Sequence, residues 1–111
     1  MRLAPGQVWY ADLDPAEGRE QARTRPVLIV SSDLHLRLTA EALATVIPLT
    51  TRERPGWRQR VRIGSGAQEC WAITEQIRTL STARLLNPHP AWIVSEPEFR
   101  DVMYAVSRMI A

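Results

Sequence analysis

Five short segments with strand character, separated by turn residues, constrain the fold of this chain more than any other feature of its sequence. They are residues 7–12, 27–31, 43–49, 60–63 and 70–74, which are rich in β-branched, aromatic or alternating apolar residues. Pro26 takes the first position of the second strand, where a missing backbone N–H is tolerated, and Pro48 predicts an edge or a bulge near the end of the third. Short strands at this spacing favour a small antiparallel barrel over a parallel sheet with crossover helices.

A helical period replaces the strand pattern at the end of the chain. Ser95 followed three residues later by Glu98 forms a capping-box sequence, which marks a helix start. Apolar residues then recur at helical spacing: Phe99, Val102, Met103, Val106, Met109 and Ile110. We expect a terminal helix that packs this stripe on the core. A shorter helix is expected from near Ser81 to just before Pro88.

The length and the cysteine content limit the class of protein. A chain of 111 residues fits a single domain, residues 1–111. Cys70 stands alone, which excludes an internal disulfide and a thiolate-cluster metal site, and we expect it to be a buried thiol. Because no apolar run approaches the ~18 residues of a membrane span, and the first residues lack a signal sequence, we expect a cytoplasmic protein with no membrane contact.

Positive charge is concentrated in the middle of the sequence. All 14 basic residues are arginines, and the formal net charge is only +2. Residues 19–62 carry nine arginines against four acids, whereas both flanking parts are slightly acidic. Within this part, Arg60 and Arg62 alternate with Val61 and Ile63, so we expect one basic, solvated strand face and one apolar face. This distribution suggests an anionic partner, of which nucleic acid is the commonest, although a charge run is more often only a solvated face.

The sequence contains few groups that perform acid–base or metal chemistry. His35 and His89 are far apart in expected loops, and we interpret them as surface residues. No His/Asp/Glu cluster has the spacing of metal ligands, so we expect neither a metal nor another cofactor. What remains is an arginine fixed before a proline, Arg25, and two adjacent threonines, Thr50 and Thr51, whose hydroxyl and N–H groups could bind a phosphate.

Three blocks of sequence make the chain recognisable. The first runs from Gly6 to Pro15, the second contains Glu20-Gln21 and continues with Arg25-Pro26-Val27, and the third combines Pro48-Leu49-Thr50-Thr51 with Glu75-Gln76-Ile77-Arg78. In this order and spacing they resemble the MazF/PemK/Kid toxin family over nearly the whole chain.

The resemblance implies a mainly β (α+β) fold, a small SH3-like antiparallel β-barrel with a C-terminal helix, assembled as a homodimer. It also implies the toxin of a type II toxin–antitoxin system, a metal-independent and sequence-selective endoribonuclease for single-stranded RNA. The implied partners are that RNA and a MazE-like antitoxin that is acidic and partly disordered.

The resemblance places the catalytic pair on Arg25 and Thr50. The RNA-binding residues that we expect around it are Arg19, Glu20, Gln21, Arg23, Thr51, Arg52, Arg58, Arg60 and Gln76. RNA carries its own nucleophile, the 2′-OH, so the enzyme must hold the phosphate and stabilise developing charge. Arg25 and Thr50 suit that task, and the expected products are a 2′,3′-cyclic phosphate and a 5′-OH.

Two alternatives remain open at the level of sequence. The first is a non-catalytic, CcdB-like toxin of similar fold that poisons DNA gyrase, since a fold does not determine a function. The second is a passive RNA-binding module.

Overall fold

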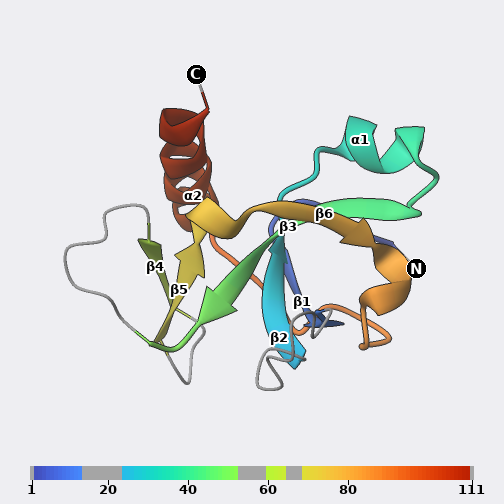
Figure 1. Ribbon diagram of the computed structural model, residues 1–111, viewed down its shortest axis with the longest axis horizontal. Coiled ribbons are helices and arrows are strands. Elements are labelled where there is room, and N and C mark those ends of the chain that lie inside the picture. Colours follow the sequence, from blue (N-terminus) through green and yellow to red (C-terminus); the bar gives the residue numbers. More distant parts are fainter. Residues whose placement is uncertain (1, 14–23, 53–59, 65–68, 111) are drawn as a thin grey trace.

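The computed structural model describes residues 2–13, 24–52, 60–64 and 69–110, and Figure 1 shows its elements. Within these residues the chain forms seven strands, two α-helices and two short 3₁₀ turns. Their order is β1 (Gln7–Asp12), β2 (Thr24–Ile29), α1 (Asp33–Leu38), β3 (Leu43–Thr50), β4 (Arg60–Gly64), β5 (Glu69–Ile73), η2 (Thr74–Gln76), β6 (Arg78–Ser81), η3 (Thr82–Arg84), β7 (Trp92–Ile93) and α2 (Glu96–Met109).

The strands form one antiparallel sheet in which β3 is the central element. The strand order is β4-β5-β3-β2-β1-β7, and β6 also pairs with β3. The first half of β3, Leu43 to Val46, pairs with β6, whereas Leu49 and Thr50 pair with β5. Because β3 changes its partner along one edge, the sheet bends and coils into a half-barrel. The mainly β fold with a C-terminal helix is therefore confirmed.

Each face of the sheet carries its own core. Trp9 and Val27 belong to a first cluster, which also contains Leu36 of α1. Val8 and Leu28, their chain neighbours, belong to a second cluster that Val102 and Val106 of α2 complete. Since successive strand residues point to opposite faces, one continuous apolar run supplies both clusters. The buried run at 27–30 therefore contributes to two layers of packing.

The capping box that starts α2 is confirmed, and it also joins α2 to the sheet. The Ser95 hydroxyl accepts a hydrogen bond from the Glu98 N–H at 3.3 Å, and the Glu98 carboxylate accepts one from the Ser95 N–H at 3.1 Å. The other Glu98 oxygen accepts a hydrogen bond from the N–H of Gly64 on β4 at 2.8 Å. The helix therefore begins at a fixed position over β4.

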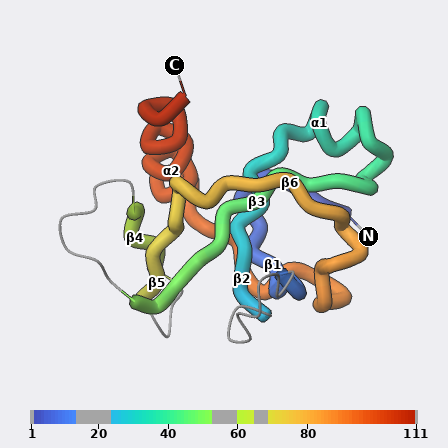
Figure 2. Tube along the Cα trace, in the orientation of Figure 1, coloured from blue at the N-terminus to red at the C-terminus, as the bar shows by residue number. Residues whose placement is uncertain are grey.

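The end of the helical stripe differs from the prediction. Val102 and Val106 are buried, and Phe99 and Met103 pack on the second cluster, but Met109 and Ile110 are 43% and 61% exposed. Figure 2 shows α2 rising away from the sheet toward the C-terminus. Its last turn has no sheet beneath it, so these two side chains remain outside the core.

Both strand prolines lie at points where a ladder ends. β2 begins at Thr24, so Pro26 is its third residue and not its first, and the ladder from β2 to β3 ends one residue away, at Val27 opposite Pro48. Of the two alternatives predicted at Pro48, an edge or a bulge, the edge is excluded because β3 is central. Pro48 is accommodated because Ile47 and Pro48 fall between the ladders to β6 and β5.

Several short elements were not predicted. They are α1, which begins at Ser32 as N-cap, and strands β6 and β7. The helix expected between Ser81 and Pro88 is only the three-residue turn η3. The six residues of α1 make fewer than two helical turns and β7 has only two residues, so neither shows a period, and β6 exists because β3 offers it a pairing edge.

Candidate active site

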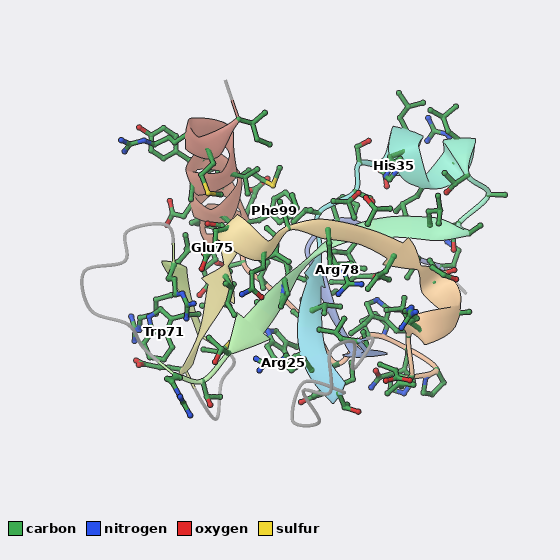
Figure 3. All side chains as sticks on the ribbon, viewed as in Figure 1. Arg25, His35, Trp71, Glu75, Arg78 and Phe99 are labelled. Carbon is green, nitrogen blue, oxygen red and sulfur yellow. The ribbon has the colours of Figure 1, made fainter. Side chains whose placement is uncertain are left out.

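Arg25 and Thr50 lie on the neighbouring strands β2 and β3, just beyond the last pair of the ladder that joins them. The pairs Ile29 with Val46, Leu28 with Ile47 and Val27 with Pro48 define the alignment of β2 with β3. The ladder ends at Val27 and Pro48, and Arg25 and Thr50 each lie two residues beyond it, on the ends of β2 and β3 that point the same way. Figure 3 shows Arg25 on the side of β2 that faces the end of β3. The fold therefore places the two expected catalytic residues at the same end of two neighbouring strands.

Local contacts hold both residues. Arg25 is half-buried and lies opposite the fully buried Ala11 of β1. The Thr50 hydroxyl accepts a hydrogen bond from the Arg52 N–H at 3.1 Å, which fixes the turn that ends β3. A hydroxyl that accepts one hydrogen bond can still donate its own proton. The Thr50 hydroxyl therefore keeps its own proton for donation, and the exposed Thr51 and Arg52 follow it directly.

The same row of side chains continues across the other edge of β3. Thr50 lies opposite Trp71 of β5, and Trp71 lies opposite Arg62 of β4. Directly paired residues place their side chains on the same face of a sheet. Their neighbours Leu49, Ala72 and Ile63 belong to the second cluster, so this row lies on the face opposite α2.

The two arginines of β4 share a face, as expected, but they have different surroundings. Arg62 is exposed and forms an ion pair with Glu69. The hydrogen bond that Arg62 donates lowers the pKa of the Glu69 carboxyl group. Arg60 has a side chain only 9% exposed and forms an ion pair with Glu75 at 3.2 Å. Val61 is half-buried and Ile63 is fully buried on the apolar face. Much of the positive charge of Arg60 is therefore balanced within the fold.

Among the remaining expected RNA-binding residues, the structure describes Gln76. Gln76 is exposed at the end of η2, the turn that leads from β5 to β6. Five others lie outside the described residues: Arg19, Glu20, Gln21, Arg23 and Arg58.

Neither histidine nor the cysteine lies in this row. His35 is on α1, where its Nδ1 lies 2.8 Å from the Ser31 hydroxyl, and that hydroxyl also accepts a hydrogen bond from the Thr45 N–H at 2.6 Å. His89 is exposed. Burial raises the pKa of the Cys70 thiol, and the Glu98 carboxylate adds to the effect. His35 therefore helps to join the start of α1 to β3 through Ser31. The prediction that Cys70 is a buried thiol is confirmed.

In the part of the chain that the structure describes, no three His, Cys, Asp or Glu side chains are grouped so that they could hold a metal ion. Across the same residues, no helix is long and apolar enough to cross a membrane.

Two residues of this site were missed by sequence reasoning. Trp71 enters the row only through the pairing of β5 with β3, and Glu75 becomes the partner of Arg60 only where η2 meets β4. Neither residue has a local sequence signal that announces its role.

The chain matches the model of the PemK-like, MazF-like toxin family of type II toxin–antitoxin systems over residues 4–110. Because the match covers almost the whole chain, the chain belongs to this family. It is 38% identical over 91 residues to endoribonuclease MazF9 of Mycobacterium tuberculosis, covering 75% of this chain and 76% of that one. It is 31% identical over 89 residues to endoribonuclease EndoA of Bacillus subtilis, covering 77% and 76%.

A solved structure of an endoribonuclease in complex with its cognate antitoxin, from a mycobacterial species, has a similar fold. It superimposes with a TM-score of 0.75 at 24% identity and covers 96% of this chain and 93% of that one.

Proposed function

We propose that this toxin is a metal-independent, sequence-selective endoribonuclease that cleaves single-stranded RNA, with Arg25 and Thr50 as its catalytic residues. The proposal is supported by the pairing of β2 with β3, whose ladder ends two residues before Arg25 and Thr50. The curated relatives MazF9 and EndoA are named endoribonucleases, which supports the same activity for this chain.

The reaction uses a nucleophile that the substrate brings. The 2′-oxygen attacks the adjacent phosphorus, the 2′-OH loses its proton, and the bond from phosphorus to the 5′-oxygen breaks as that oxygen gains a proton. The products are a 2′,3′-cyclic phosphate and a 5′-OH. The protein must hold the phosphate in line for attack and stabilise the charge that develops on its non-bridging oxygens.

Arg25 and Thr50 divide this task. A guanidinium donates two parallel hydrogen bonds to phosphate oxygens, and it keeps its charge at every physiological pH. We therefore assign charge stabilisation to Arg25, since a group that holds its proton so tightly is a poor base. The Thr50 hydroxyl donates a further hydrogen bond to the same oxygens. RNA-binding residues around the pair, including Thr51 and Arg52, position the strand.

The biological setting belongs to the same proposal. The toxin forms a homodimer in the cytoplasm, and an acidic, partly disordered antitoxin inhibits it by covering the basic segment 19–62. The family description and the similar toxin–antitoxin complex support the antitoxin partner.

Incubation of the protein with single-stranded RNA in excess EDTA tests the activity. We expect cleavage to persist, with 2′,3′-cyclic phosphate ends. Arg25→Ala should lower the rate of the chemical step by about 10²–10³, as loss of one charge-stabilising donor does. Arg100→Ala is the matched control, because Arg100 is an exposed arginine on α2.

Other outcomes would favour the alternatives. Binding of RNA without cleavage indicates a passive module, and neither binding nor cleavage indicates a gyrase poison. The family match and the curated endoribonucleases favour the nuclease over the gyrase poison. If Arg25→Ala cleaves RNA at the wild-type rate, the assignment of Arg25 is wrong.

A further inference from the structure

Trp71 lies beside the expected catalytic pair because of the way β3 pairs with both neighbours. Thr50 is directly opposite Trp71, and β2, which carries Arg25, pairs with β3 up to Val27 opposite Pro48. Cβ atoms of directly opposite residues are ~4.5–5.5 Å apart in an antiparallel ladder. Figure 3 shows Arg25 and Trp71 on the two flanks of the end of β3. The Cβ atom of Trp71 is therefore about one strand spacing from that of Thr50.

Trp71 does not pack in either core cluster, whereas the other described tryptophans do. Trp9 is 1% exposed within the first cluster, and Trp92 packs against the second. Trp71 is half-buried, and the structure assigns it to neither cluster. A large aromatic side chain that is only half-buried, on the face away from α2 and among polar neighbours, calls for an explanation.

The neighbours of Trp71 on this face are charged. Arg62 lies directly opposite it on β4, and Glu69 lies two residues earlier on β5, paired with Arg62. The ion pair borders the indole at the end of the strand pair, and Thr50 borders it on the other side. The surroundings are those of an aromatic platform with polar edges, which suits a planar ligand that carries hydrogen-bonding groups at its rim.

We propose that Trp71 stacks on the base of the nucleotide next to the cleaved phosphate. This inference rests on the proposed function, since it places the phosphate at Arg25 and Thr50. Single-stranded nucleic acids are bound by stacking of successive bases on aromatic side chains. Because a purine offers a larger stacking surface than a pyrimidine, Trp71 favours a purine at that one position and contributes to the selection of the cleaved sequence.

Binding of RNA oligonucleotides with a single abasic nucleotide tests the proposal. The cleaved bond is first mapped on a natural RNA, and its 2′-OH is then replaced by hydrogen so that the strand stays intact. Affinity is measured for the parent strand and for strands that lack one base at each position around this bond. The proteins compared are the wild type, Trp71→Leu, which keeps apolar bulk, and Trp71→Phe, which keeps an aromatic ring.

We expect Trp71→Leu to bind the parent strand about 5- to 150-fold more weakly, the range for stacking of one base. Trp71→Phe should lose much less. On the strand that lacks the stacked base, wild type and Trp71→Leu should bind equally well, because neither can form the contact. Tyr104→Leu, which alters an exposed aromatic residue on α2, should bind like the wild type.

The failures can be told apart. If RNA is cleaved but Trp71→Leu binds the parent strand normally, the stacking proposal is overturned and the nuclease assignment stands. The proposal is also overturned if the RNA affinity of Trp71→Leu is reduced by the same factor on every abasic strand. It is likewise overturned if Trp71→Leu weakens binding of the antitoxin but not of RNA. Absence of cleavage by the wild type refutes the proposed function itself.

Discussion

Glu98 connects the first turn of α2 to β4, and its removal should destabilise the fold by a predictable amount. Its carboxylate accepts hydrogen bonds from the backbone N–H groups of Ser95 and Gly64, at 3.1 and 2.8 Å. A hydrogen bond to a charged group contributes ~1.5–3 kcal/mol when it is well shielded, and about 1 kcal/mol is reasonable for this half-buried side chain. Glu98→Ala should therefore lower the free energy of unfolding by about 2 kcal/mol.

Urea denaturation at fixed protein concentration measures this change. With a slope of about 1.5 kcal/mol per M, typical for small domains, the midpoint of Glu98→Ala should fall by about 1.3 M. Glu98→Gln keeps one oxygen as an acceptor, so it should lose about half as much. Glu96→Gln removes the same charge from the same turn and serves as the control for the helix dipole.

The effect should depend on pH with a definite sign. Burial alone would raise the pKa of Glu98, but hydrogen bonds from Gly64 and Ser95, together with the charge of Arg62, lower it below its usual value near 4.5. The unfolded chain therefore takes up the proton first as the pH falls. The advantage of wild type over Glu98→Gln should be complete near neutral pH and should decline below about pH 4.5. A Glu98→Ala midpoint equal to that of Glu96→Gln, or an advantage that grows in acid, would refute this account.

The remaining predictions concern the basic residues and the antitoxin. Arg52→Gln should reduce the salt dependence of RNA binding, lowering the slope of log K against log salt by about 0.7, since the exposed Arg52 follows the phosphate site. Arg60→Gln should instead destabilise the fold by about 1–3 kcal/mol, less than for a fully buried pair because Glu75 keeps 24% exposure; an equal loss of salt slope in both variants would show that Arg60 also contacts RNA. A saturating 2′-deoxy RNA analogue should weaken antitoxin binding; equal antitoxin affinity with and without the analogue would contradict direct competition.

The sequence alone determined the elements whose signals are local. A continuous β-branched run such as Val27–Val30 predicts a buried strand, and Ser95 with Glu98 predicts the start of α2, because these patterns depend on residues close in the chain. The family blocks predict Arg25 and Thr50 as the catalytic pair without any geometry. The short elements α1, β6 and β7 carry too few residues for such a pattern, so they were missed.

The tertiary structure decided which of these residues act together. The row Arg25, Thr50, Trp71 and Arg62 draws on four strands, and its composition depends on the register of three ladders. A shift of one residue in any ladder would send a side chain to the opposite face, and no local pattern specifies that alignment. The burial of Arg60 against Glu75 has the same origin, because the turn η2 meets β4 only once β5 has paired. Sequence therefore supplied the chemical groups, and nonlocal strand pairing selected those that share a face.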